Sequence, residues 1–114
     1  MEEPLFESRC GLRITKTAVY SINFTFGNII ESWPLSRIKL YRDKIVLKAA
    51  LKPAVELRLK DIISIEKKLL YILISHNDPR VHKYVRITGV GTASSLHKKL
   101  RKAAEDNNLG IKFV

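Results

Sequence analysis

The chain has 114 residues, a length that suits a single domain with a substantial hydrophobic core, and its 46% apolar content excludes a disordered tail. Lysine and arginine outnumber aspartate and glutamate by 21 to 11, so the formal charge is +10. Such an excess favours a polyanionic partner: nucleic acid, an anionic membrane surface or an acidic protein. The single cysteine, Cys10, excludes an intrachain disulfide and fits a reducing cytosol.

The composition also bears on habitat and location. Glutamine is absent while isoleucine and lysine are abundant, a trend of hyperthermophile proteins that leads us to expect a thermophilic source. The first residues, MEEPLFESRCG, are acidic and lack a hydrophobic region, so we expect no signal peptide. The longest uncharged stretch, 17–30, is too short to span a bilayer. We therefore expect a soluble, cytoplasmic protein.

Alternating apolar and polar residues predict about seven short antiparallel strands over 12–90. Residues 1–10 are expected to form a poorly ordered or edge-docked lead-in. The segment 18–26 places aromatic and β-branched side chains on one face, as a half-buried strand does. Because Pro34 has no backbone N–H to donate, the next strand is expected to begin near Leu35.

The remaining strands are expected over 45–51, 54–59, 69–75 and 81–90. The alternation breaks after Leu59, where Asp61 precedes the apolar residues Ile62, Ile63 and Ile65. A bend or bulge at Asp61 would let the chain turn a barrel corner and keep the isoleucines inside. This break predicts a closed or nearly closed sheet rather than a flat one.

The period changes near residue 92, and 92–109 is predicted to be a helix with a narrow apolar stripe. Thr92 or Ser94 is the expected N-cap, and Gly110 the expected residue after the last turn. Residues 111–114 are expected to pack against the sheet. The predicted fold is thus α+β but mainly β, a single domain over 1–114 in which one C-terminal helix caps an antiparallel barrel. The stripe consists of Ala93, Leu96, Leu100, Ala103 and Ala104.

This order of elements resembles the pleckstrin-homology-like (PH-like) superfold, which includes GRAM and bacterial PH domains. The resemblance covers about 33–104, and Leu59, Asp61, Ile62 and Ile65 match the family segment that turns the barrel corner. It implies a barrel capped by a helix, and a domain that binds rather than catalyses. A weaker resemblance is to the amino-terminal half of archaeal CheF-type taxis adaptors. The segments that carry the PH-like likeness are RIKLYRDKIVLKAA, VELRLKDIISIEKK, YILISHND, KYVRITG and SSLHKKLRKAA.

Residues capable of chemistry are few and scattered. His76 and His82 flank one turn with Asp78 between them, but two imidazoles without a third ligand make a poor metal site, and exposed turn residues are the simpler interpretation. Cys10 has no histidine near it in sequence and is expected to be a small buried or terminal residue. The sequence therefore predicts no catalytic residues, no metal and no cofactor.

Basic residues are the most informative side chains. They gather on outward strand positions, at the last hairpin and on the open side of the helix, and such clusters attract phosphate-rich surfaces. The expected basic patch consists of Arg37, Lys39, Arg42, Lys44, Arg80, Lys83, Arg86, Lys98, Lys99, Arg101 and Lys102.

Trp33, beside Pro34, is the other candidate for a contact site. A large aromatic residue at the start of a strand either plugs the end of a barrel or anchors a partner. We predict a non-enzymatic binding or adaptor module with a protein partner, docked in a groove beside the helix or on an exposed strand edge. The alternative is electrostatic binding of an anionic membrane surface, with phosphoinositide-like headgroups, or of nucleic acid through the basic patch.

Overall fold

The computed structural model describes residues 3–15, 29–89 and 91–114, and within these ranges the protein is mainly β with one helix near the C-terminus. Eight strands are present there, where about seven were predicted for the whole chain. The strand predicted over 18–26 lies outside the described residues. The elements are β1 Phe6–Thr15, β2 Ile29–Leu40, β3 Lys44–Lys48, β4 Val55–Arg58, a 3-10 turn Leu59–Asp61, β5 Ile62–Lys67, β6 Tyr71–His76, β7 Tyr84–Thr88, α1 Thr92–Asp106 and β8 Lys112–Phe113.

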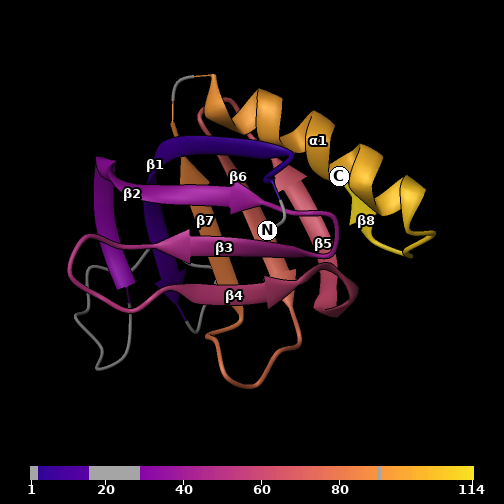
Figure 1. Ribbon diagram of the computed structural model, residues 1–114, viewed down its shortest axis with the longest axis horizontal. Helices are drawn as coiled ribbons and strands as arrows, with labels where there is room; N and C mark the ends of the chain where they lie inside the picture. The colour runs from indigo at the N-terminus through magenta and orange to yellow at the C-terminus, as the bar shows by residue number, and fades with distance from the viewer. Residues whose placement is uncertain (1–2, 16–28, 90) are drawn as a thin grey trace.

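The strands form a single sheet in the order β4-β3-β2-β1-β7-β6-β5-β8, and every pair is antiparallel except β5 with β8. In Figure 1, β3, β4 and the later part of β2 run across the view, whereas β5, β6 and β7 run more upright behind them. β1 belongs to both sets, because it pairs with β2 along most of its length and with β7 from Gly11 to Thr15. Its register with β2 shifts between Cys10 and Leu12, where it bends from one set into the other.

The expected lead-in over residues 1–10 is wrong from Phe6 onward, since β1 begins there. The reason is packing. Cys10 is fully buried and Phe6 packs against the core, whereas Glu7 and Arg9 point outward. The start of β1 is therefore fixed to the core by Phe6 and Cys10. These two apolar residues are too few to form a recognisable strand pattern in the sequence.

The second strand likewise begins earlier than predicted, at Ile29 rather than near Leu35. The pairing of β2 with β1 passes from Ser36–Cys10 to Glu31–Leu12, so residues 32–35 lie within an irregularity. Pro34 is tolerated in such a place because regular ladder bonds are interrupted there.

The predicted bend at Asp61 is confirmed. The chain leaves β4 through the 3-10 turn, where buried Leu59 donates its N–H to the Asp43 carbonyl at 2.9 Å and Asp61 pairs with Arg58 at 3.1 Å. Ile62 and Ile65 enter the core, but Ile63 is 48% exposed, contrary to prediction. A register shift between Ile62 and Ser64 turns Ile63 outward.

The helix packs across β1, β5, β6 and β7 with the predicted stripe buried. Its ends differ from prediction, because the N-cap is Gly91 and the left-handed residue after the last turn is Asn108, with φ 54°. Asn108 and Leu109 donate their N–H groups to the carbonyls of Glu105 and Ala104, the two bonds of a Schellman motif. The chain has therefore already reversed two residues before Gly110.

The final two predicted strands are shorter than expected. β6 starts at Tyr71, leaving Leu69 and Leu70 exposed in the preceding turn, and β7 starts at Tyr84 rather than at residue 81. Between the strands and α1 lies one continuous core of aliphatic side chains. Over the described ranges, no helix is long and apolar enough to cross a membrane.

Candidate functional site

The last residues of the chain form a short strand on the outer edge of β5. The Val114 N–H donates to the Ile65 carbonyl at 2.9 Å, and the Lys67 N–H donates to the Val114 carbonyl at 3.3 Å. The Phe113 ring meets the His97 ring edge-on with centroids 5.5 Å apart, and the Arg101 guanidinium lies 5.5 Å from its centroid. The space between β5 and α1 therefore accepts an extended segment that carries an aromatic side chain.

His97 is the titratable group that contacts Phe113 of β8. Its partial burial, and secondarily the charges of Arg101 and Lys67, hold the pKa of the imidazole below its usual value. The neutral ring is therefore favoured beside Phe113, which suits an apolar contact better than a charged one would.

Exposed apolar side chains adjoin this edge of the sheet. Leu69 is 90% exposed and Leu70 55% exposed in the turn between β5 and β6, and Val114 is 64% exposed. The bond from Lys67 to Val114 places β8 beside the start of that turn. We call Leu69, Leu70 and Val114 the apolar tip. Adjoining exposed apolar side chains of this kind mark contact sites more often than isolated ones do.

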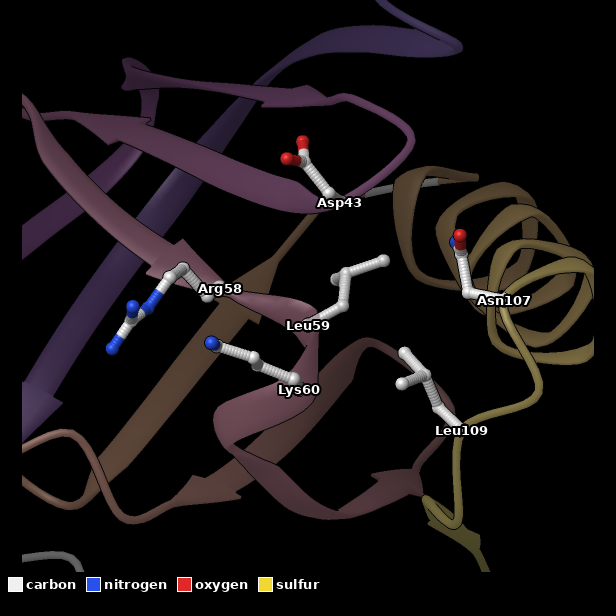
Figure 2. Close-up of a pocket in the computed structure, with 6 residues that line it drawn as sticks. All are labelled: Asp43, Arg58, Leu59, Lys60, Asn107 and Leu109. Atoms are coloured by element: carbon white, nitrogen blue, oxygen red, sulfur yellow. The ribbon is translucent and has the colours of Figure 1, made fainter.

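A pocket of about 350 Å³ lies between the 3-10 turn and the end of α1, below the turn between β2 and β3 (Figure 2). In this view Leu59 and Leu109 face the space near Asn107, whereas the charged ends of Arg58 and Lys60 extend away from the helix. The Asn107 amide already donates to the carbonyls of Arg42 and Ala103. The lining thus combines two leucines with charged and amide groups. The lining is Asp43, Arg58, Leu59, Lys60, Asn107 and Leu109.

Two buried side chains, His76 at the end of β6 and Asp78 in the loop that follows, hold the connection to β7, so His76 is not the exposed turn residue that was expected. His76 is buried, its Nδ1 accepts the Asp78 N–H at 3.0 Å, and its Nε2 lies 2.8 Å from the His82 carbonyl. These partners fix the tautomer with the proton on Nε2. Both ring nitrogens are therefore committed to holding the loop.

Asp78 is buried in the same loop and is held by Arg80 through two side-chain bonds, at 2.8 and 3.1 Å, and by the Arg80 N–H at 2.9 Å. These hydrogen bonds, first the side-chain ones and then the backbone one, hold the pKa of the Asp78 carboxyl well below its usual range. In the described part of the chain, no group of three histidine, cysteine or acidic residues is placed to hold a metal ion. Cys10 is fully buried in the core.

The members of the predicted basic patch come from several elements of the fold. Arg37, Lys39 and Lys44 lie on the β2–β3 part of the sheet, Arg42 lies in the turn between these two strands, and the helical members lie on α1. Several have neighbours that compensate them. Lys39 pairs with Glu7 at 3.8 Å, Lys44 with Glu56 at 3.3 Å and Arg80 with Asp78 at 2.8 Å, while Arg86 and Lys83 lie 4.4 and 5.7 Å from the ring centroids of Tyr71 and Tyr84. The exposed helical members are Lys98, Lys99, Arg101 and Lys102.

Two basic residues that the sequence did not single out complete a denser group. Arg9 on β1 stands opposite Arg37 on β2, and Arg37 stands opposite Lys48 on β3. All three are exposed, and no described residue forms an ion pair with any of them. We call this group the basic row. Arg9 was missed because its strand was taken for a lead-in, although the alternation of FESRC could have revealed it.

Trp33, the predicted partner anchor, falls within β2 by its backbone, but its side chain is outside what the structure describes. The choice between a plug and an anchor stays a prediction. No protein-family model matches the sequence, and a search of the curated proteins finds no relative.

Proposed function

We propose that the protein is a non-enzymatic binding module, and that its partner is another protein that docks at the β5 edge. The observation that supports this proposal is the pairing of β8 with β5. There, the six-residue strand β5 is paired along its outer side with an edge strand of only two residues, next to the three exposed side chains of the apolar tip. Strand edges next to apolar surface are the sites at which extended peptides add to sheets.

The pairing pattern supports a PH-like fold for this module. β1 to β4 form one antiparallel meander, β5 to β7 form a second, and β1 joins them by pairing with β7. The two sets cross at a steep angle and α1 follows the last antiparallel strand (Figure 1). A barrel in which α1 covers one mouth accounts for these features, and for the 3-10 turn at the corner between β4 and β5. The buried thiol of Cys10 is in keeping with a cytoplasmic setting.

Affinity purification from cells of the source organism tests the protein-binding role. Wild-type protein is compared with Leu69→Ser/Leu70→Ser and with Leu5→Ser, which alters another exposed leucine, one that lies beside Leu40 at the end of β2. We expect a protein that is retained by the wild type and by Leu5→Ser and is lost with the double variant. Retention that is equal in all three proteins, after nuclease and detergent treatment, would count against the β5 edge.

The helical basic residues favour a second candidate, electrostatic binding of nucleic acid or of an anionic membrane. Lys98, Lys99 and Lys102 are exposed within two turns of α1, and none pairs with a carboxylate of the described residues. Binding of this kind weakens steeply as salt rises. A titration against oligothymidylate and phosphatidylserine vesicles at low salt tests it, and absence of binding to both would exclude it.

A further inference from the structure

The basic row is a surface of three cations, none of which pairs with a carboxylate of the described residues. Residues directly opposite one another in neighbouring antiparallel strands have their Cα atoms about 4.5–5.5 Å apart and their side chains on the same face. Arg9, Arg37 and Lys48 therefore bring three positive charges into one line across β1, β2 and β3. Like charges so placed oppose sheet formation. Lys48 relieves part of this by donating to the carbonyls of Ala49 and Lys52, which are neutral groups.

Exposed leucines border one side of the row. Leu35 precedes Arg37 by two residues and is 59% exposed, and Leu51 follows Lys48 by three residues and is 97% exposed. Since Arg37 and Lys48 are register partners, both leucines lie toward the turn that joins β3 to β4. The surface thus offers cations and aliphatic side chains together.

The opposite side of the row bears carboxylates. Glu7 faces Lys39 in the β1–β2 register, and Glu56 faces Val46 in the β3–β4 register, one row away on the same face. Both glutamates form ion pairs, with Lys39 and Lys44, so this side adds little net positive charge with which to attract a wide anionic plane such as a membrane. A narrow ligand can lie along the row itself, where the cations have no carboxylate partner among the described residues.

From this surface we infer that the basic row, with Leu35 and Leu51, binds an acidic segment of a protein partner that also carries apolar side chains. Carboxylates on one face of a helix are about 5–6 Å apart at i and i+3 or i+4, close to the spacing of the row. Arginine binds carboxylates with two parallel hydrogen bonds. Single-stranded nucleic acid is disfavoured, because its readers stack bases on aromatic rings and the row is bordered by leucines.

We build this inference on the proposed function as a protein-binding module, to which it adds a second surface. The two surfaces use different strands, since the row lies on β1, β2 and β3 and the apolar tip adjoins β5 and β8. A module with two such surfaces can hold two partners at once, as an adaptor does.

Titration with a synthetic amphipathic peptide of glutamate and leucine, followed by fluorescence anisotropy at low salt, tests the row. We expect Arg37→Glu to weaken binding on the order of tenfold or more, as loss of a central interface residue does. Arg9→Glu is expected to weaken binding as well, and it replaces Arg37→Glu in the test if Arg37→Glu does not fold. The matched control is Lys98→Glu, which makes the same charge change on α1 and is expected to have a much smaller effect.

Leu35→Ser and Leu51→Ser are expected to weaken peptide binding without changing its dependence on salt. Equal losses in Arg37→Glu and Lys98→Glu would overturn the inference, because net charge alone would then explain binding. Tighter binding of oligothymidylate or of phosphatidylcholine–phosphatidylserine vesicles than of the peptide would also overturn it. Leu69→Ser/Leu70→Ser should leave the peptide bound, so failure of the row and failure of the β5 edge give different patterns.

Discussion

Single side chains hold the loop between β6 and β7. His76 accepts one backbone N–H and donates to one carbonyl, and Asp78 gathers the guanidinium and the backbone N–H of Arg80. Buried polar groups are stable only when they are paired in this way. These hydrogen bonds therefore fix the shape of the loop. The residue types of 76–80, HNDPR, indicate a turn but do not reveal these bonds.

The lowered pKa of Asp78 predicts a specific dependence of stability on pH. An aspartate in the unfolded chain has a pKa of about 3.9. The Asp78 carboxylate therefore contributes its full stabilisation of the folded protein above that pH, and this contribution is lost as the pH falls further. We expect Asp78→Asn to destabilise the protein at pH 7 and to flatten the decline below about pH 4. Urea unfolding at both pH values measures this, with Glu105→Gln on the exposed side of α1 as the control.

The aromatic ring of β8 gives a second prediction at this scale. Phe113→Ala removes a half-buried ring that contacts His97 and Arg101, and we expect a loss of about 1–3 kcal/mol in the free energy of unfolding. Lys112→Ala, on the exposed side of the same two-residue strand, should cost much less. Faster hydrogen exchange at the Val114 N–H in Phe113→Ala would locate the loss at β8, and an unchanged rate would contradict the assignment.

Among the elements, the end of α1 shows where sequence reasoning misses. The helix itself was predictable, since its apolar stripe repeats at the helical period and all five members are buried. Its C-terminus was not, because Asn108 rather than Gly110 takes the left-handed conformation. Asparagine adopts that conformation more easily than most residues, but a nearby glycine is the stronger signal in sequence.

Substitutions at this end separate the two residues. Asn108→Gly is expected to keep or raise stability by up to about 1 kcal/mol, and Asn108→Val to lower it by about 1–2 kcal/mol, because a β-branched side chain opposes a positive φ. Gly110→Ala is expected to be nearly neutral, since an added Cβ there meets nothing within 4 Å. Thermal unfolding of the three variants measures the order, and a larger loss at Gly110 than at Asn108 would reverse the assignment.

The strands show a similar division. The corner at Asp61 was predictable from the break in alternation, whereas Ile63 faces outward because a bulge shifts the register, which residue types alone do not reveal. β1 was missed in part because its Glu7 and Arg9 make the segment look like a charged terminus. The same limit applies to the candidate site. The sequence identified the basic residues on β2 and α1, but the alignment of Arg9 with Arg37 in the basic row depends on cross-strand register, which residue types do not reveal.

For the whole molecule, the three like charges of the basic row predict that a substitution which weakens binding of the acidic peptide can raise the stability of the fold. Arg37→Glu would place a carboxylate between Arg9 and Lys48, and each new cross-strand pair is worth about 0.2–1 kcal/mol. We therefore expect the variant to unfold at a higher temperature than the wild type while binding the acidic peptide less well. The gain should shrink as salt rises, and a lower melting temperature at low salt would contradict it.

The position of β1 also governs how the chain reaches its folded state. Gly11 pairs with Thr88, so the sheet joins segments that are far apart in the sequence. Closing so large a loop costs entropy before any contact repays it, and proteins dominated by such contacts fold slowly. During synthesis, the first strand must wait on the ribosome with one edge open until the seventh has emerged. Glu7 and Arg9, which directly precede this open segment, would discourage premature association with other nascent chains during that wait.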